Sequence, residues 1–327
     1  MIVSKTPLRM SFIGGGSDLP AYYLQNKGAV ISTSIQKYIY IALHPKFNNK
    51  FRLSYSKTED IDSIHNIEHP LFRETLKLLN INNGLEISSM ADIPSKGSGL
   101  GSSSSFTVGL LNALYSYKNI TPSKSLLAKQ ACEIEISKCG EMIGKQDQYA
   151  AAYGGLNLIE FNPDSSVNIS PIKTSNLFIS EFENNIIVFY TGITRKAGSI
   201  LVQQSKDILN SSFKTKILDD MVELCYSFKK EIENNDVKNL GSILDKNWDL
   251  KKTLSNKVTN PIIDNIYNIG MESGASGGKI LGAGNGGFMM FISDPKYHHI
   301  IRKKLSNLRE VKFNFSTLGS EIILNTN

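Results

Sequence analysis

Residues 97–105 read GSGLGSSSS, and this run of three glycines and five serines decides how the chain is interpreted. An apolar helical pattern, FTVGLLNAL, follows at 106–114, and a β-like stretch ending at Pro94 precedes it. Glycines let successive backbone N–H groups converge on an anion, and the N-terminus of a helix adds partial positive charge. A strand, this Gly/Ser loop (residues 97–105) and a helix therefore predict a phosphate-binding site. An ordinary glycine turn whose serines cap the helix would also explain this pattern of residues.

The Gly/Ser loop differs from the common nucleotide-binding pattern G-x-x-x-x-G-K-[ST], in which a lysine directly precedes the Ser or Thr. Here Ser102 follows Gly101, and the nearby lysine, Lys96, lies upstream. A free linker is also disfavoured because strand and helix patterns flank the loop. Any phosphate bound here would therefore be held mainly by backbone N–H groups and hydroxyls.

A second glycine-rich stretch, GGKILGAGNGGFMMF at 277–291, matches G-x-G-x-x-G from Gly282 to Gly287. A dinucleotide-binding fold needs a helix after that loop. FMMFIS at 288–293 reads as an apolar strand instead, so a nicotinamide oxidoreductase is disfavoured. The alternative interpretation is a tight turn where backbones pack closely.

A third glycine-rich stretch opens the chain as TPLRMSFIGGGSDLP at 6–20. Arg9 lies in a strand-like pattern, and three glycines separate that pattern from Asp18. The glycines would allow a substrate to approach the backbone, and Asp18 would accept hydrogen bonds from sugar hydroxyls. A hairpin turn with a solvated carboxylate remains an equal alternative.

The bulk properties of the chain limit the class of protein. Its 327 residues favour two domains, and 41% hydrophobic with 20% charged residues favour a large folded core. The net charge of +6 suits nucleotides and sugar phosphates, or simply a surface with many lysines. We expect no nucleic-acid partner and no membrane span, and a cytoplasmic location, because basic stripes, signal-like segments and long apolar runs are not seen. Three cysteines without C-x-x-C predict neither a disulfide frame nor a zinc site.

Strand patterns dominate the first half of the chain and helical patterns the second, which predicts an α+β, two-domain protein. Strands are expected at 1–12, 28–43, 51–56, 85–94, 154–161, 183–192 and 286–293, with two more at the C-terminal end. Helices are expected at 69–79, from the serine run to 117, from Thr121-Pro122 to about 140, over much of 197–275, and at 295–308. The domains are placed at 1–185 and 186–327.

Taken in order, the three glycine-rich stretches resemble the motifs of the GHMP small-molecule kinases, a family that includes galactokinase and mevalonate kinase. Residues 94–105 resemble the motif P-x-x-x-G-L-G-S-S, residues 279–288 the third motif, and residues 6–20 the first. GGGSD at 14–18 and GKQDQYAAAYGG at 144–155 look most like the heptose 7-phosphate kinases, with fucokinase-type enzymes next. The resemblance implies an N-terminal domain like ribosomal protein S5 domain 2 and a ferredoxin-like C-terminal domain with added helices.

The resemblance also implies roles for individual residues. Asp147 matches the catalytic aspartate, which would otherwise be taken for a turn or cap residue, and Arg9 matches the basic residue of the first motif. ATP would be bound by Pro94, Lys96, Gly97, Ser98, Gly99, Leu100, Gly101, Ser102, Ser103 and Ser104. Mg²⁺ would be held by Ser103 and by a glutamate before Asp147. Glu135 is chosen over Glu133 because helical spacing places it on the same face of the predicted helix as a stripe of small residues. The alternative is that Glu135 is a solvated surface glutamate.

The implied acceptor is the anomeric hydroxyl of D-glycero-D-manno-heptose 7-phosphate, giving the 1,7-bisphosphate for nucleotide-heptose and surface polysaccharide synthesis. Substrate contacts are expected from Gly14, Gly15, Gly16, Ser17, Asp18, Gln148, Arg195 and Lys196, the last two for the 7-phosphate. Supporting contacts are expected from Gly282, Ala283, Gly284, Gly286 and Gly287. A fucose- or galactose-type kinase and a non-catalytic sugar sensor remain alternatives, and a homo-oligomer is left open.

Overall fold

The larger of two sheets is built on the antiparallel pair of β1 (Ile2–Ile13) and β2 (Gly28–Pro45). The computed structural model describes residues 1–93, 97–194 and 197–326. The side chains of β1 are buried from Thr6 onward, and they include the polar Arg9 and Ser11 between apolar neighbours. The register of the pair shifts after Pro7, which has no backbone N–H to give to the ladder.

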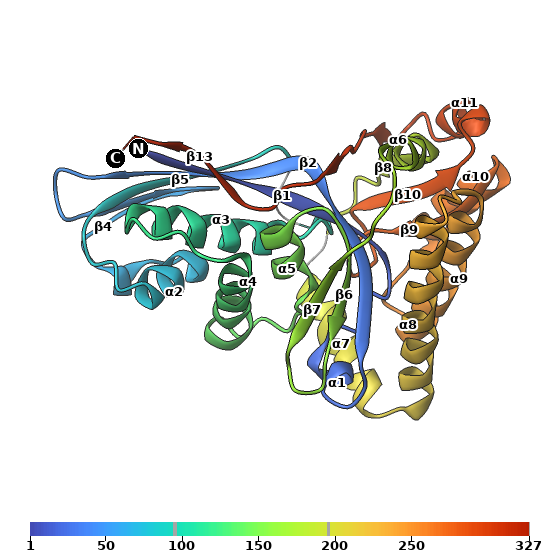
Figure 1. The fold of residues 1–327 in the computed structure, drawn as a ribbon, viewed down its shortest axis with the longest axis horizontal. Helices are drawn as coiled ribbons and strands as arrows, with labels where there is room; N and C mark the ends of the chain where they lie inside the picture. The colour runs from blue at the N-terminus through green and yellow to red at the C-terminus, as the bar shows by residue number, and fades with distance from the viewer. Residues whose placement is uncertain (94–96, 195–196, 327) are drawn as a thin grey trace.

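Further strands extend this sheet on both sides of the central pair. They are β3 (Phe51–Ser54), β4 (Thr58–Ile61), β5 (Leu85–Ala91), β6 (Leu156–Phe161), β7 (Val167–Pro171), β12 (Phe315–Ser316) and β13 (Glu321–Asn325). Within the described residues the order is β13-β1-β2-β5-β3-β4, while β12 and β6 also pair with β2, and β7 pairs with β6. The chain therefore returns at its end to the sheet that it began, and Figure 1 shows the two termini side by side.

Helices cover one face of the larger sheet (Figure 1). They include α2 (Pro70–Leu78), α3 (Ser102–Tyr117), α4 (Lys124–Cys132), its π-helical continuation η2 (Glu133–Lys138) and α5 (Gln146–Tyr153), and a short α1 (Pro20–Tyr23) follows β1. The α3 helix is buried on almost every side, with the polar Thr107 and Asn112 buried among its apolar residues. It begins after Gly101, whose φ of +74° suits glycine.

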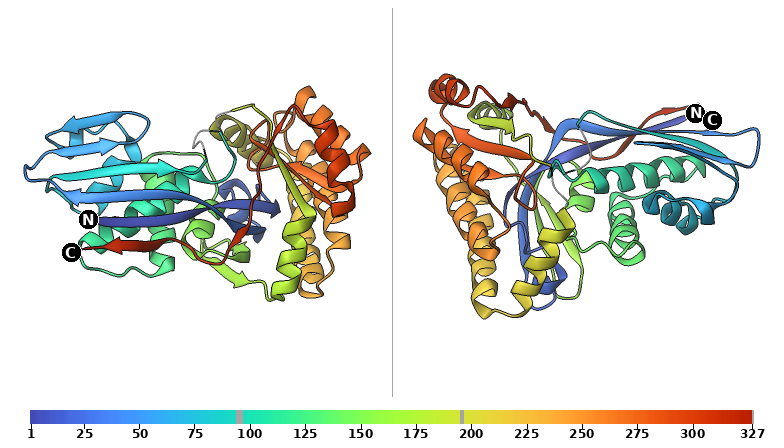
Figure 2. Two further views of the ribbon diagram at one scale, coloured as in Figure 1. Left: turned by 90° about the horizontal axis from the view of Figure 1, so that it is seen from above. Right: turned by 180° about the vertical axis from the view of Figure 1, so that it is seen from behind.

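The second sheet has the order β11-β8-β10-β9, in antiparallel pairs, within the part of the chain that the structure describes. Its strands are β8 (Ile186–Tyr190), β9 (Ala275–Ile280), β10 (Phe288–Ser293) and β11 (Arg309–Glu310). The helices of this half are α6 (Asn176–Asn185), α7 (Ala197–Leu209), α8 (Ser212–Glu233), α9 (Lys238–Leu254), α10 (Pro261–Glu272) and α11 (Pro295–Lys304). Figure 2 shows that these helices gather at the end of the molecule opposite the chain termini.

Aromatic side chains join the two halves of the molecule. Phe12 at the end of β1 packs against Phe182 of α6 and Phe228 of α8, with ring centroids 5.3 and 5.6 Å apart. Phe315 of β12 completes the group, and one hydrophobic core contains residues from both halves. Because Phe12 lies three residues after Arg9, this packing fixes the strand that carries a predicted catalytic residue.

The α+β class predicted from the sequence is confirmed, but elements including α1, α6, β4 and β7 were not predicted and several element boundaries were wrong. The helix expected from Thr121-Pro122 is capped instead by Ser123, whose hydroxyl accepts the Leu126 N–H. Its second half winds as a π-helix from Glu133, which sequence periodicity does not reveal.

The strand expected at 183–192 begins only at Ile186, because α6 occupies the residues before it. The predicted domain boundary after residue 185 stays a prediction, with β12 and β13 of the second half pairing into the larger sheet. Among the residues described, no helix combines the length and apolarity needed to cross a bilayer.

Candidate active site

A cavity of about 770 Å³ lies where the Gly/Ser loop, the turn after β1, the start of α5 and the turn after β9 meet. These segments are distant in sequence, and all three glycine-rich stretches contribute to its wall. The cavity therefore brings together the residues that the sequence motifs predicted separately.

The Gly/Ser loop presents backbone and hydroxyl groups to this cavity. Gly97, Gly99 and Gly101 have φ values of +72°, +75° and +74°, a conformation that side chains with a Cβ rarely adopt. The Ser103 side chain is exposed in the first turn of α3, while Ser102 is buried. The loop leads into the N-terminus of a 16-residue helix, whose unpaired N–H groups favour an anion.

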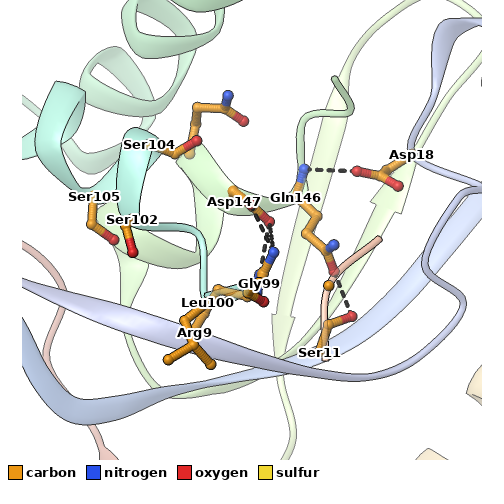
Figure 3. Close-up of polar contacts among 12 residues, drawn as sticks. Arg9, Ser11, Asp18, Gly99, Leu100, Ser102, Ser104, Ser105, Gln146 and Asp147 are labelled. Atoms are coloured by element: carbon orange, nitrogen blue, oxygen red, sulfur yellow. Dashed lines mark hydrogen bonds and ion pairs between the residues drawn. The ribbon is translucent and has the colours of Figure 1, made fainter. Parts of the chain in front are cut away.

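Arg9 and Asp147 form the main ion pair of the cavity wall (Figure 3). Arg9 Nε and Nη2 each donate to a carboxylate oxygen of Asp147 at 2.7 Å, and Nη1 donates to the Gly99 carbonyl at 2.6 Å. Arg9 is only 4% exposed, whereas the Asp147 side chain is 26% exposed. Asp147 is thus held firmly yet stays accessible to a ligand, as a proton-accepting carboxylate must be.

Glu135 lies behind the serines of α3. Its carboxylate accepts from Ser103 Oγ at 2.5 Å, Ser104 Oγ at 2.7 Å and Gln148 Nε2 at 2.6 Å. Burial raises the pKa of Glu135 to about 7, although the three hydrogen bonds oppose this shift. Glu133 is instead half-buried and pairs with Lys138, so only Glu135 reaches the serine run.

Asp18 is fixed in the cavity wall by backbone groups. Its Oδ1 accepts the Gly16 N–H at 3.0 Å, and its Oδ2 accepts the N–H of Gln146 at 3.3 Å (Figure 3). A Cβ at Gly144 would overlap the Asp18 carboxylate, so the glycine is needed for this approach. Burial, followed by the charge of Asp147, raises the pKa of Asp18. Two carboxylates with different surroundings therefore face the same cavity.

Cations from the second half of the chain approach the same region. The Lys279 ammonium is buried and donates to the carbonyls of Ser11 and Phe12, both at 2.8 Å. Burial, and then the charges of Lys251 and Arg9, hold the pKa of Lys279 well below its usual range. Lys251 donates to the Gly282 carbonyl at 2.9 Å and lines the cavity. Lys251 therefore gives this side of the cavity a basic group for an anionic ligand, whereas Lys279, whose charged form is disfavoured, holds the carbonyls at the end of β1.

The turn after β9 packs directly against the Gly/Ser loop. A Cβ on Gly282 would lie 2.6 Å from Gly99 Cα, and one on Gly287 would overlap the Ser98 carbonyl. Such close contact is possible only without side chains. The turn supports the loop over several residues while contributing only Gly282 and Ala283 to the cavity wall.

Not every residue predicted for the site reaches the cavity. Among the described residues, those that lie elsewhere are Gly14, Ser17, Leu100, Glu135, Gln148, Gly284, Gly286 and Gly287. Ser17 donates to the carbonyls of Gly14 and Ala29 and thereby holds the turn after β1, while Gln148 holds Glu135. The predicted residues Pro94, Lys96, Arg195 and Lys196 lie outside the described residues.

Among the residues of the site that sequence reasoning missed are Gln146, Lys251 and Gln204 in the wall, and Lys279 beneath it. Gln146 adjoins Asp147 and receives a hydrogen bond from Ser11 at 2.8 Å, so its place in the motif was the available signal. Lys251 and Gln204 sit on amphipathic helices without any motif, and only the packing of the two halves brings them to the cavity.

Comparison with known proteins identifies the family of this chain. The model of the GHMP kinases N terminal domain matches residues 67–155, and that of the GHMP kinases C terminal domain matches residues 228–308. The D-glycero-alpha-D-manno-heptose 7-phosphate kinase of Campylobacter jejuni is 32% identical, over 95% of this chain and 96% of that protein. The galactokinase of Pyrococcus furiosus is 28% identical, over 90% of this chain and 89% of that protein.

The fold is shared with a solved D-glycero-D-manno-heptose 1-phosphate kinase from Bacteroides thetaiotaomicron. The TM-score is 0.83 at 23% identity, and the match covers 100% of each chain. The resemblance drawn from the three glycine-rich stretches is thereby confirmed. The chain belongs to the GHMP kinase family and is an ATP-dependent phosphotransferase.

Proposed function

We propose that this enzyme transfers the γ-phosphoryl group of ATP to the anomeric hydroxyl of D-glycero-D-manno-heptose 7-phosphate, giving the 1,7-bisphosphate and ADP. The relative that is 32% identical along nearly the whole chain is a kinase of that sugar phosphate. The observation that carries the proposal is the Arg9–Asp147 pair, which faces one cavity with the Gly/Ser loop and Asp18. That cavity offers a phosphate cradle, a base and a carboxylate for sugar hydroxyls.

Asp147 is the proposed general base. Its carboxylate accepts the proton of the acceptor hydroxyl while that oxygen attacks the γ-phosphorus, and the bond from phosphorus to the leaving oxygen of ADP breaks. ADP takes the electron pair of that bond, and no covalent enzyme intermediate forms. Arg9 orients the carboxylate through two hydrogen bonds and offsets negative charge that develops on the phosphoryl group.

Ser103 and Glu135 are the proposed ligands of a Mg²⁺ ion that accompanies ATP. Both side chains offer hard oxygen atoms as ligands, and Ser103 Oγ lies 2.5 Å from Glu135 Oε1. Ser103 is exposed to the cavity. Mg²⁺ commonly uses one or two protein oxygens together with phosphates and water, so this small set fits it. When bound, the ion would neutralise phosphate charge. Glu135 must then release the proton that its buried setting favours.

The remaining walls suggest where the two substrates lie. His69, Pro70 and Leu71 also line the cavity, and the His69 ring lies 5.4 Å from that of Phe106, the residue after the Gly/Ser loop, so we assign the nucleoside of ATP to this part. Asp18 and the backbone of Gly15 and Gly16 line the part assigned to the sugar. The binding of the 7-phosphate by Arg195 and Lys196 remains a proposal, and it fails if Arg195→Glu leaves the KM for the heptose unchanged.

A sugar kinase with a different acceptor is the second candidate, because a galactokinase is 28% identical over most of the chain. The test is an ATP-consumption panel of heptose 7-phosphate, fucose, galactose and mevalonate at equal concentrations. The proposal expects kcat/KM for heptose 7-phosphate to exceed the others by about 100-fold or more. Turnover of galactose or fucose instead would replace it, and turnover of none would revive a non-catalytic sensor. A cytoplasmic role in nucleotide-heptose and surface polysaccharide supply belongs to the same proposal.

A further inference from the structure

Gln204 of α7 is a buried carboxamide that the proposed chemistry leaves unused. The residue is 1% exposed, lines the same cavity as Asp18 and Asp147, and comes from the second half of the chain. Neither Nε2 nor Oε1 has a hydrogen-bond partner among the described residues. A buried amide without partners costs free energy, so such groups commonly mark a place where a ligand completes the hydrogen bonds.

The turn after β1 is shaped to admit this side chain. Gly16 has a φ of +116°, and a Cβ built there would overlap Gln204 Nε2. Gly16 thus serves two purposes, since its N–H holds Asp18 at 3.0 Å and its missing side chain makes room for the amide. Gln204 therefore lies beside the carboxylate that is proposed to bind sugar hydroxyls.

Continuous contacts connect this amide to the reacting end of the cavity. Gln204 lies against Gly16, Gly16 donates to Asp18, and Asp18 accepts from the backbone of Gln146, the residue before Asp147. Counted along this series of contacts, Gln204 lies farther from the proposed base than Asp18 does. A group bound by Gln204 would belong to the part of the acceptor away from the hydroxyl that is phosphorylated.

We infer that Gln204 is a specificity-determining residue that hydrogen-bonds a second hydroxyl of the acceptor, away from the one phosphorylated. The inference rests on the proposed function, which makes the acceptor a polyhydroxylated sugar phosphate. A carboxamide donates and accepts, and a hydroxyl does the same, so one hydroxyl can satisfy both Nε2 and Oε1. A neutral amide is poorly matched to a phosphate, for which the cavity has cations.

The test compares Gln204→Leu with Gln203→Leu. Gln203 is the neighbouring glutamine on α7, half-buried and bonded to Asp207 at 2.9 Å, and it does not line the cavity. We expect Q204L to lower kcat/KM for heptose 7-phosphate about 10-fold or more, with the KM for ATP unchanged within about twofold. Q203L should match the wild-type chain in both measurements.

The 2-, 3-, 4- and 6-deoxy forms of heptose 7-phosphate separate recognition from a merely structural effect. One of them should be a poor substrate of the wild-type enzyme, yet it should lose no further activity with Q204L. Equal losses on all four analogues, or wild-type activity of Q204L on the heptose, would overturn the inference. If thermal melting shows that Q204L does not fold, Gln204→Glu takes its place. This variant keeps the length of the side chain but lacks the amide N–H donor.

Failure of the proposed function is distinguishable from failure of this inference. A wild-type chain that phosphorylates galactose or fucose but not heptose 7-phosphate overturns only the proposed acceptor. Q204L and Q203L are then compared on that sugar and its deoxy forms, with the same two outcomes.

Discussion

Arg9 bonds Asp147 through both carboxylate oxygens at 2.7 Å while its third nitrogen bonds the Gly99 carbonyl at 2.6 Å. One side chain therefore ties the proposed base to the loop that is proposed to hold the phosphates. The backbone N–H of Arg9 adds a further bond to the Leu100 carbonyl at 3.0 Å. Movement of the Gly/Ser loop and orientation of the base are thus coupled through β1.

Replacing the base should remove catalysis but preserve nucleotide binding. Asp147→Asn keeps the shape of the side chain but cannot accept a proton, so we expect kcat to fall about 10²- to 10⁴-fold. Calorimetry should give a Kd for ATP within about threefold of the wild-type value. Asp164→Asn, in an exposed turn, is the control and should leave both quantities unchanged. If D147N retains near-wild-type turnover, Asp147 is not the base.

Glu135 should make stability depend on pH in a defined window. Burial raises the pKa of Glu135 to about 7 from an ordinary 4.5. Between these values the unfolded chain binds fewer protons at this site than the native chain does, so stability falls as pH rises from about 4.5 to about 7. Glutamine does not ionise. As pH rises from about 4.5 to about 7, the free energy of unfolding of E135Q should therefore increase by about 3 kcal/mol relative to that of the wild-type chain. Urea unfolding without Mg²⁺ or nucleotide measures the difference.

Glu133 provides the matched control for that titration. It is two residues away, half-buried and paired with Lys138. An ion pair that is about half open to solvent contributes little, so E133Q should follow the wild-type curve within about 1 kcal/mol at each pH. A difference between E135Q and wild type that is constant with pH would show that Glu135 is not held as a protonated acid near neutrality.

The close approach of the Gly/Ser loop to the turn after β9 can be tested with alanine at two glycines of similar φ. Gly99 has a φ of +75° and a Cβ there would overlap the Leu281 carbonyl, while Gly140 has a φ of +70° with open space around it. G140A should cost about 1–2 kcal/mol of unfolding free energy, from backbone strain alone. G99A should cost about 3 kcal/mol or more and weaken ATP binding, because backbone atoms must also shift. Equal costs for the two variants would contradict this packing.

Asp18→Asn should affect the acceptor rather than the nucleotide. The substitution retains one acceptor oxygen for the Gly16 or Gln146 N–H but removes the charge that binds sugar hydroxyls strongly. We expect the KM for the sugar to rise about 10-fold, with the KM for ATP within about twofold. Steady-state kinetics with each substrate varied in turn measures both. A rise confined to the KM for ATP would place Asp18 on the nucleotide side instead.

The three glycine-rich stretches made much of the site predictable from sequence. Asp18 and Ser103 each lie in or beside a glycine run, and Arg9 lies in the strand-like pattern that precedes the first run. Their convergence follows from the fold, because β1, the start of α3 and the turn after β9 meet at one cavity. The family resemblance supplied Asp147, which an isolated reading of its sequence would leave as a cap residue.

Other parts of the site depend on packing that no local pattern encodes. Gln204 and Lys251 lie on amphipathic helices of the second half, and their roles arise only when these helices meet the turn after β1. Periodicity also misjudged the helix that carries Glu135, since its π-helical turn alters the spacing on which a helical wheel relies. Glu135 still reaches Ser103, because it lies with Ile134 on the buried side of this segment while Lys138 is exposed.

The most direct test of the central claim is phosphorus NMR of the product formed from ATP and D-glycero-D-manno-heptose 7-phosphate. The account predicts a new resonance from a phosphate on the anomeric carbon, formed in equal amount to ADP and essentially missing with D147N. The original 7-phosphate resonance should persist in the same product. A phosphate at any other position, or ADP formed without a phosphorylated sugar, would contradict the account.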